Sequence, residues 1–160
     1  MATTLTKHER NLSAIIHAST FSKYFVPFGN FIFPLILWTA NKKEHSFVDY
    51  NGKQALNFQI SLLLYSILIS IISIPFFIGF MPDLFDRSFW GFHRLSDLNN
   101  LNIHIDSDNF RWGRFFWPAG ISGLLHAALV VINVVYSVLA TIRTNEGQYF
   151  QYPLTIKFIK

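Results

Sequence analysis

Residues 54–82 read QALNFQISLLLYSILISIISIPFFIGFMP, and this stretch contains no Asp, Glu, Lys or Arg. A second stretch without these residues, 115–142, reads FFWPAGISGLLHAALVVINVVYSVLATI. Since a helix rises about 1.5 Å per residue, about 20 apolar residues cross the roughly 30 Å hydrocarbon core of a bilayer. Both stretches are longer than that. The sequence therefore predicts an integral membrane protein with long transmembrane helices over residues 54–82 and 115–143.

The composition indicates a single membrane domain over residues 1–160. Of the 160 residues, 51% are hydrophobic and 14% are charged, whereas soluble domains average about 25% charged residues. The formal net charge of +4 indicates basic flanks beside anionic lipid, so we expect membrane lipids as partners and no nucleic acid. The chain has no Cys, which excludes disulfides, thiolate nucleophiles and cysteine-based zinc sites.

A broken apolar segment over residues 11–41 precedes the first long helix. Its run is interrupted by Lys23, Pro27, Gly29 and Pro34. Because Pro removes a backbone donor and Gly accepts the dihedral angles of a turn, the pattern predicts a helix break. Two structures stay open for this segment. One is a single kinked span, and the other is a hairpin of short helices over 12–24 and 31–40.

The distribution of basic residues favours the hairpin. A single kinked span would place seven basic residues on one side of the membrane and six on the other. The hairpin would place nine on the side of both termini and leave the four arginines of loop 83–114 on the other. Cytoplasmic flanks carry the excess of Lys and Arg. We therefore expect a multi-pass protein of the bacterial cytoplasmic (inner) membrane, with both termini cytoplasmic and an extracytoplasmic loop over 83–114.

The remaining segments complete a predicted all-α integral membrane helical bundle. Residues 41–53 are predicted to form a cytoplasmic connector, and Asn51-Gly52 within it is a turn signal. Residues 144–160 combine aromatic and apolar residues with two lysines. This composition predicts an interfacial C-terminal tail on the cytoplasmic leaflet.

Polar residues inside the two long helices form stripes. Each stripe shares one helical face at about 100° per residue. In an antiparallel pair, His126 comes level with Ser70–Ser73, and Asn133 comes level with Tyr65–Ser66. We interpret the stripes as packing contacts between helices, and the alternative is a polar path for a proton, ion or peptide. The intramembrane stripe consists of Ser66, Ser70, Ser73, Ser122, His126, Asn133 and Ser137, together with Gln59.

Motifs that carry chemistry are scarce. No HExxH, P-loop, GxGxxG or G-x-S-x-G pattern is present. Residues 120–123 superficially resemble the serine loop of intramembrane serine proteases, but small-residue packing is the better interpretation. Residues 106–109 begin like a calcium loop and lack the glycine and glutamate that it needs, and a weak metal site there with His93 and His104 is the alternative to a solvated loop. We predict no enzyme, no catalytic residue, no cofactor and no metal site.

Three sequence elements go beyond generic membrane composition. Residues 24–30 read YFVPFGN, residues 52–59 read GKQALNFQ, and residues 152–154 read YPL. With these elements in this order, the chain resembles small bacterial membrane proteins of domain-of-unknown-function family 4870, in the Tic20-like superfamily of import components. The resemblance covers most of residues 11–80 and 117–160, and it implies an association with protein translocation. The long loop over 83–114 departs from the short turn that the family has there.

A polar cluster at the cytoplasmic entrance of the first long helix is the candidate site. We expect Asp49, Asn51, Lys53, Gln54 and Asn57 to cap the helix and to pair with tyrosines of the tail. A structural or partner-binding role is predicted in preference to ligand binding. The full candidate set is His17, Asn30, Asp49, Asn51, Gly52, Lys53, Gln54, Asn57, Gln59, Tyr149 and Tyr152.

Two function classes follow from these residues. The first is a non-catalytic subunit, or an assembly or translocation-associated factor, of a membrane protein complex. Its partners would be other integral membrane proteins, in a hetero-complex rather than a homo-oligomer. The alternative is a small oligomeric channel or transporter, in which Gln59, Asn133 and His126 line a polar path.

Deletion of residues 147–160 tests the expected docking of the tail on the polar cluster. We expect the shortened chain to unfold at a lower temperature in detergent, because the cluster loses its tyrosine partners. Thermal unfolding of the two chains side by side is the measurement. Unchanged thermal stability would contradict tail docking.

Overall fold

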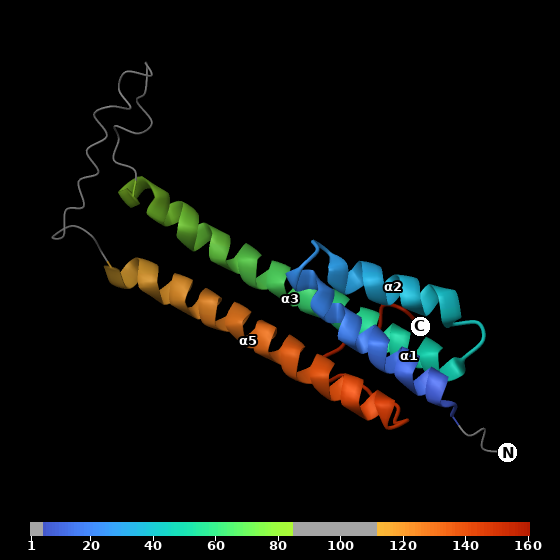
Figure 1. The fold of residues 1–160 in the computed structure, drawn as a ribbon. Coiled ribbons are helices and arrows are strands. Elements are labelled where there is room, and N and C mark those ends of the chain that lie inside the picture. The colour runs from blue at the N-terminus through green and yellow to red at the C-terminus, as the bar shows by residue number, and fades with distance from the viewer. Residues whose placement is uncertain (1–4, 85–111) are drawn as a thin grey trace. The chain divides into compact units, whose positions relative to one another are not determined.

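The structure is a computed structural model that describes the backbone of residues 5–84 and 112–160 and the side chains of residues 5–75 and 119–160. Within these ranges it is all-helical (Figure 1), which confirms the predicted fold class. The elements are α1 (Lys7–Ala18), the 3₁₀ helix η1 (Ser19–Tyr24), α2 (Gly29–Asn41), α3 (Ser46–Leu84) and α5 (Trp112–Asn145). Most of the predicted loop over 83–114, for which a weak metal site was the alternative to a solvated loop, lies outside the described residues.

The chain divides into two compact units. One unit combines Met1–Ser66 with Ala128–Lys160, and the other is Ile67–Ala127. The first unit contains α1, η1, α2, the first half of α3, the last part of α5 and the C-terminal tail. The second unit contains the rest of the two long helices.

The N-terminal segment is a helical hairpin. Helix α1 begins with a capping box, in which the Thr6 hydroxyl accepts from the Glu9 amide at 3.2 Å and the Glu9 carboxylate accepts from the Thr6 amide at 2.8 Å. These hydrogen bonds from Thr6 hold the pKa of the Glu9 carboxyl below its ordinary value. Helix α2 then runs back beside α1 (Figure 1), so the hairpin is observed rather than the single kinked span.

The turn of the hairpin depends on two residues. Phe28, at the start of α2, has a left-handed φ of 59°. Gly29 follows it, and a Cβ at this position would lie 2.6 Å from Ser22 Oγ and 2.8 Å from the Ser22 carbonyl oxygen. The turn therefore closes only because Gly29 lacks a side chain.

Helix α3 begins eight residues earlier than the start predicted at residue 54, so the connector is 42–45 rather than 41–53, and the predicted turn at Asn51-Gly52 is wrong. Both residues lie inside α3. The Asn51 amide donates to the Phe47 carbonyl oxygen at 2.9 Å, four residues back along the helix. Gly52 lies directly against the indole of Trp38 in α2. Tertiary packing has overridden the local turn signal here.

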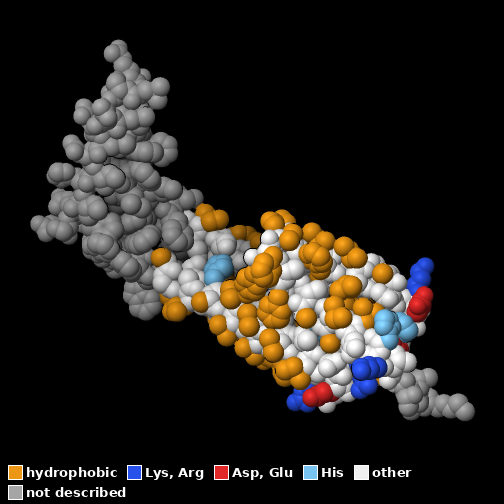
Figure 2. Space-filling view, viewed as in Figure 1, with side chains coloured by type: hydrophobic (Ala, Val, Ile, Leu, Met, Phe, Trp, Pro, Cys, Tyr) orange, Lys and Arg blue, Asp and Glu red, His pale blue; other side chains and the backbone are white. Residues whose placement is uncertain are grey.

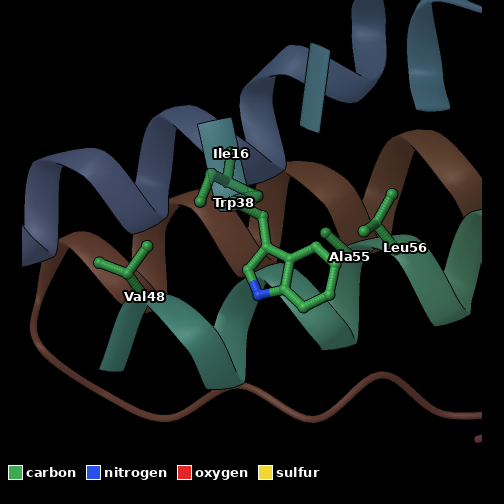
Figure 3. Close-up of a cluster of buried hydrophobic side chains, with 5 residues drawn as sticks. All are labelled: Ile16, Trp38, Val48, Ala55 and Leu56. Carbon is green, nitrogen blue, oxygen red and sulfur yellow. The ribbon is translucent and has the colours of Figure 1, made fainter. Parts of the chain in front are cut away.

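A small apolar core joins the hairpin to α3. Trp38 points from α2 toward α3, and Ile16 of α1 lies above it (Figure 3). The indole Nε1 donates to Asp49 Oδ1 at 2.9 Å, and the Lys42 ammonium lies 4.4 Å from the ring centroid. The tryptophan therefore has an apolar body in the core and a polar edge at the charged end of the unit. The buried residues of this core are Ile16, Trp38, Val48, Ala55 and Leu56.

The outer surface is apolar, while much of the interior is polar. Two segments, Ser46–Pro75 and Ala119–Asn145, are long and apolar enough to cross a membrane by length and composition. Hydrophobic side chains cover much of the visible face of the described residues, and charged side chains gather toward the end where α1 begins (Figure 2). A surface of this kind is matched to lipid rather than to water. Large exposed apolar residues include Ile32, Phe33, Leu35, Ile36, Leu124, Val131, Val135 and Ile142.

Gly52→Ala tests the packing of the hairpin on α3. A Cβ would overlap the indole and would lie 2.8 Å from Trp38 Cβ, and such overpacking costs about 1–3 kcal/mol. We expect a clearly lowered midpoint of thermal unfolding in detergent. The matched control is Gly120→Ala, because a Cβ there meets nothing within 4 Å. Equal midpoints for the two variants would contradict the close approach of α2 and α3.

Candidate functional site

The first unit encloses a network of buried polar side chains centred on His17. His17 is fully buried on α1. Its Nε2 lies 3.3 Å from Asn51 Oδ1 on α3, and its Nδ1 lies 2.9 Å from the Tyr152 hydroxyl oxygen of the tail. The Asn51 amide nitrogen already donates within α3, so Oδ1 accepts from Nε2–H and Nδ1 accepts from the tyrosine. This assignment makes His17 a neutral imidazole with both nitrogens paired.

Tyr152 fills the space between the hairpin and α3. Its ring stacks on Phe58, with centroids 4.1 Å apart and planes 15° apart. Phe150 meets the same ring edge-to-face at 5.0 Å. The residue is buried although it belongs to the C-terminal tail. One side chain thus connects α1, α3 and the tail.

A second chain of polar contacts links α2, α3 and α5. The Asn30 amide donates to Gln59 Oε1 at 2.9 Å. Gln59 and Asn133 exchange amide hydrogen bonds at 3.3 Å in both directions. Ser137 donates to Asn133 Oδ1 at 3.1 Å, and its hydroxyl lies 3.3 Å from that of Thr20 in η1. Since lipid offers no hydrogen bonds, these pairs hold the four elements together.

Three side chains of α3 bind the backbone of the tail. Asn57, Ser61 and Tyr65 are four residues apart and therefore share one helix face. We call them the α3 ladder. Asn57 Oδ1 accepts from the amides of Phe158 and Ile159 at 3.1 and 2.8 Å, and its amide nitrogen donates to the Ile159 carbonyl oxygen at 2.9 Å.

The other two side chains of the α3 ladder, Ser61 and Tyr65, bind earlier residues of the tail. Ser61 Oγ accepts from the Ile156 amide at 2.9 Å. The Tyr65 hydroxyl donates to the Leu154 carbonyl oxygen at 2.8 Å. The predicted interfacial tail is therefore an extended segment bound along α3.

The structure brings together only part of the predicted cluster. Asp49 pairs with Lys53 at 2.6 Å and with Trp38, apart from the tail. Gln54 is buried, and its Oε1 has no partner among the described residues. Tyr149 is 58% exposed and makes ring contacts with Phe47 and Tyr50. Part of the predicted set forms hydrogen bonds within the network or the α3 ladder. These residues are His17, Asn30, Asn51, Asn57, Gln59 and Tyr152.

The intramembrane stripe is split between the two units. In the second unit, His126 Nδ1 donates to the Ser122 carbonyl oxygen at 2.8 Å, and Ser70 Oγ lies 3.4 Å from Nε2. Ser73 donates back to the Ile69 carbonyl oxygen. In the first unit, Asn133 is hydrogen-bonded to Gln59, whereas matching of depths predicted a level with Tyr65–Ser66. Ser66 is half-buried on α3.

A family model matches residues 8–159, and its description is the magnetosome magnetite crystal formation protein family, MamF/MmsF. The chain belongs to this family. No curated protein and no solved structure matches the chain.

The match to the MamF/MmsF family shows that the assignment to domain-of-unknown-function family 4870 and the Tic20-like superfamily was wrong. The elements that suggested it, 24–30, 52–59 and 152–154, all lie within the matched residues. In this MamF/MmsF chain they form the hairpin turn, the α3 side of the network and the turn of the tail. Such motifs report how helices pack, and they do not specify protein translocation.

The sequence reasoning missed several polar partners in this family member. Ser61 and Tyr65 are the clearest, because their spacing of four residues from Asn57 places them on one face with it. Thr6 and Glu9 form a capping box, which the T-x-x-E pattern of residues 6–9 predicts. Thr20 carried no comparable signal, since its partner Ser137 is distant in the chain.

The described part of the chain shows no cluster of metal-ligating side chains. Among residues 5–75 and 119–160, no group of three or more His, Cys, Asp or Glu is placed to hold a metal ion. The network consists of neutral side chains that satisfy one another. This arrangement is suited to holding helices and tail in one geometry.

Tyr152→Phe tests the connection at the centre of the network. The phenylalanine keeps the stack on Phe58 but removes the hydroxyl beside His17 Nδ1. A buried polar atom that loses its partner costs about 1–3 kcal/mol, so the midpoint of thermal unfolding should fall. The control is Tyr149→Phe, at an exposed tyrosine of the same tail. Equal effects of the two substitutions would contradict the central role of Tyr152.

Proposed function

We propose that this chain is a non-catalytic integral membrane protein that serves as a subunit or assembly factor of a membrane protein complex. We place that complex in the process named in the family description, magnetite crystal formation in magnetosomes. The observation that carries the proposal is the pairing of buried polar side chains, His17 with Asn51 and Tyr152, and Gln59 with Asn133. These side chains are buried, and their hydrogen bonds join helices and tail, which supports a structural use of the polar groups.

The apolar outer surface supports a role in binding other membrane proteins. Helix α2 exposes Ile32, Phe33, Leu35 and Ile36, while its partner face is packed on α1 and α3. Side chains of this kind contact either lipid tails or the helices of a partner. A rigid interior with an apolar exterior suits a component that organises neighbouring proteins, and we propose a hetero-complex.

The distribution of charge supports a cytoplasmic location of both termini. Lys42 and Lys43 follow α2, and Lys53 lies near the start of α3. Arg143 lies at the end of α5. These residues flank the apolar segments at the end from which the tail departs. By the positive-inside rule we propose that this end faces the cytoplasm.

A channel is less well supported by the geometry. It requires Gln59 and Asn133 to line a polar path, whereas both are buried and hydrogen-bonded to each other. His126 donates to its own helix through Nδ1. These contacts use the polar groups for packing.

Gentle-detergent purification of a tagged chain, followed by mass spectrometry, tests the proposal. We expect other integral membrane proteins to copurify in fixed ratio, because a subunit or assembly factor binds them stably. The control is His126→Leu, which should abolish any conduction and leave partner capture unchanged. Recovery of the chain only as a homo-oligomer, with ion flux in liposomes that His126→Leu removes, would contradict the subunit role and support the channel.

The same chain can be tested for the process of the family name. In a magnetite-forming bacterium that lacks its own family member, expression of the chain should restore crystal size, measured by electron microscopy. The matched comparison is the Tyr152→Phe variant at equal membrane abundance. No change in crystal size with the unaltered chain present in the membrane would contradict this part of the proposal.

A further inference from the structure

The N-terminal hairpin is too short to cross a bilayer. Helix α2 has 13 residues and is therefore about 20 Å long, less than the roughly 30 Å of the hydrocarbon core. Its first turn is level with Gln59 on α3, because the Asn30 amide donates to Gln59 Oε1 at 2.9 Å. Gln59 lies about 7.5 Å along α3 from Gln54, where the stretch without charged residues begins. Since one leaflet contributes about 15 Å to the core, the hairpin ends within a single leaflet.

The turn of the hairpin has the surface that such a position requires. Phe25 is 88% exposed and Phe28 is 70% exposed, so both rings point away from the helices that carry them. The Lys23 ammonium lies beside them, 5.0 Å from the centroid of the Tyr24 ring. A lysine near the middle of a bilayer is costly, but within one leaflet its long stem lets the ammonium reach the headgroups. The turn is therefore suited to a shallow position in lipid.

The end at which the hairpin begins and ends is basic. Charged side chains gather there on the visible face (Figure 2). Apart from Lys23, the basic residues of the described side chains are Lys7, Arg10, Lys42, Lys43, Lys53, Arg143, Lys157 and Lys160, and the acidic ones are Glu9, Glu44, Asp49 and Glu146. Such an excess of Lys and Arg beside apolar segments attracts anionic lipid headgroups. The charge therefore indicates that the exposed turn contacts lipid of the adjoining leaflet.

The first unit contains elements that the described residues of the second unit lack. It holds α1, η1, α2 and the tail in addition to its parts of α3 and α5. The described residues of the second unit belong to α3 and α5. Each additional helix, about 10 Å wide with its side chains, takes area that lipid would occupy in the leaflet of the hairpin. Insertion into one leaflet is favoured where curvature spreads the lipids of that leaflet apart.

We propose that the hairpin inserts into the leaflet at the basic end alone, and that the chain accumulates in anionic membranes where this leaflet is convex. The same insertion is unfavourable where the leaflet is concave, because its lipids are already compressed there. The inference thus specifies the sign of the preferred curvature. It goes beyond the proposed function, since it concerns lipid and requires no protein partner.

Enrichment on membrane tubes tests the proposal with the full chain. The chain has no Cys, so Gln151→Cys, at an exposed residue of the tail, provides one labelling site. The protein is reconstituted into giant vesicles of phosphatidylcholine and phosphatidylglycerol, and a membrane-impermeant dye then labels only the copies whose tail is outside. In a tube pulled outward from the vesicle, the outer leaflet is convex. We expect the ratio of protein to lipid fluorescence to be about twofold or more higher on a narrow tube than on the vesicle.

The opposite orientation is the matched control. In a second preparation all copies are labelled, and an impermeant reductant then destroys the dye outside, so that only copies with the tail inside are seen. Their hairpin lies in the concave leaflet, so we expect depletion from the tube. The same ratio for both orientations, or no enrichment of the copies with the tail outside, would overturn the proposal.

A polar hairpin turn tests which residues carry the effect. Phe25→Ser with Phe28→Asn removes both exposed rings, and Asn accepts the left-handed φ of 59° at position 28. We expect this variant to lose about half or more of the enrichment, since less of the turn inserts into lipid. The control Ile72→Asn with Leu124→Ser, at exposed residues of the second unit, should leave the enrichment unchanged. Equal enrichment of the two variants would overturn the insertion of the turn.

Discussion

The hydrogen-bonded contact of His17 with Asn51 and Tyr152 is the interaction on which the first unit depends. A hydrocarbon solvent supplies no hydrogen bonds, so each polar group that enters it needs a partner within the protein. Because His17 has two nitrogens on opposite sides of its ring, it satisfies this need by joining two elements at once. The helical hairpin, α3 and the tail therefore have one arrangement in which all three residues are paired.

The elements that could be predicted from the sequence depend on local composition. The long helices follow from the absence of charge over residues 54–82 and 115–142, since no other element crosses lipid as a single segment. The hairpin follows from Pro27 and Gly29, together with the count of basic residues. The start of α3 was missed because Asn51-Gly52 is a turn signal when only the local sequence is considered. In the fold, Gly52 packs against Trp38 and Asn51 contacts His17, and both residues are helical.

The candidate site was less predictable, because its contacts join residues that are far apart in the chain. His17 and Tyr152 lie 135 positions apart, and nothing in either neighbourhood specifies the other. Helical phase placed Gln59 and Asn133 on inward faces, but it did not specify that they face each other. The spacing of Asn57, Ser61 and Tyr65 was visible, yet its meaning required the path of the tail. Short motifs also misassigned the family, since they reflect helix packing shared by many membrane proteins.

The position of Tyr152 after α5, far from His17 in the chain, has a consequence for biosynthesis. Polypeptides leave the ribosome from the N-terminus, and early segments reach their environment first. His17 and Asn51 thus enter the bilayer while the residue that completes their pairing is still untranslated. During this interval, Nδ1 of His17 lacks the hydrogen bond that the Tyr152 hydroxyl donates in the folded protein. Synthesis of Tyr152, 135 positions after His17, is needed to close that interval, so the interior is completed only after α5 has been made.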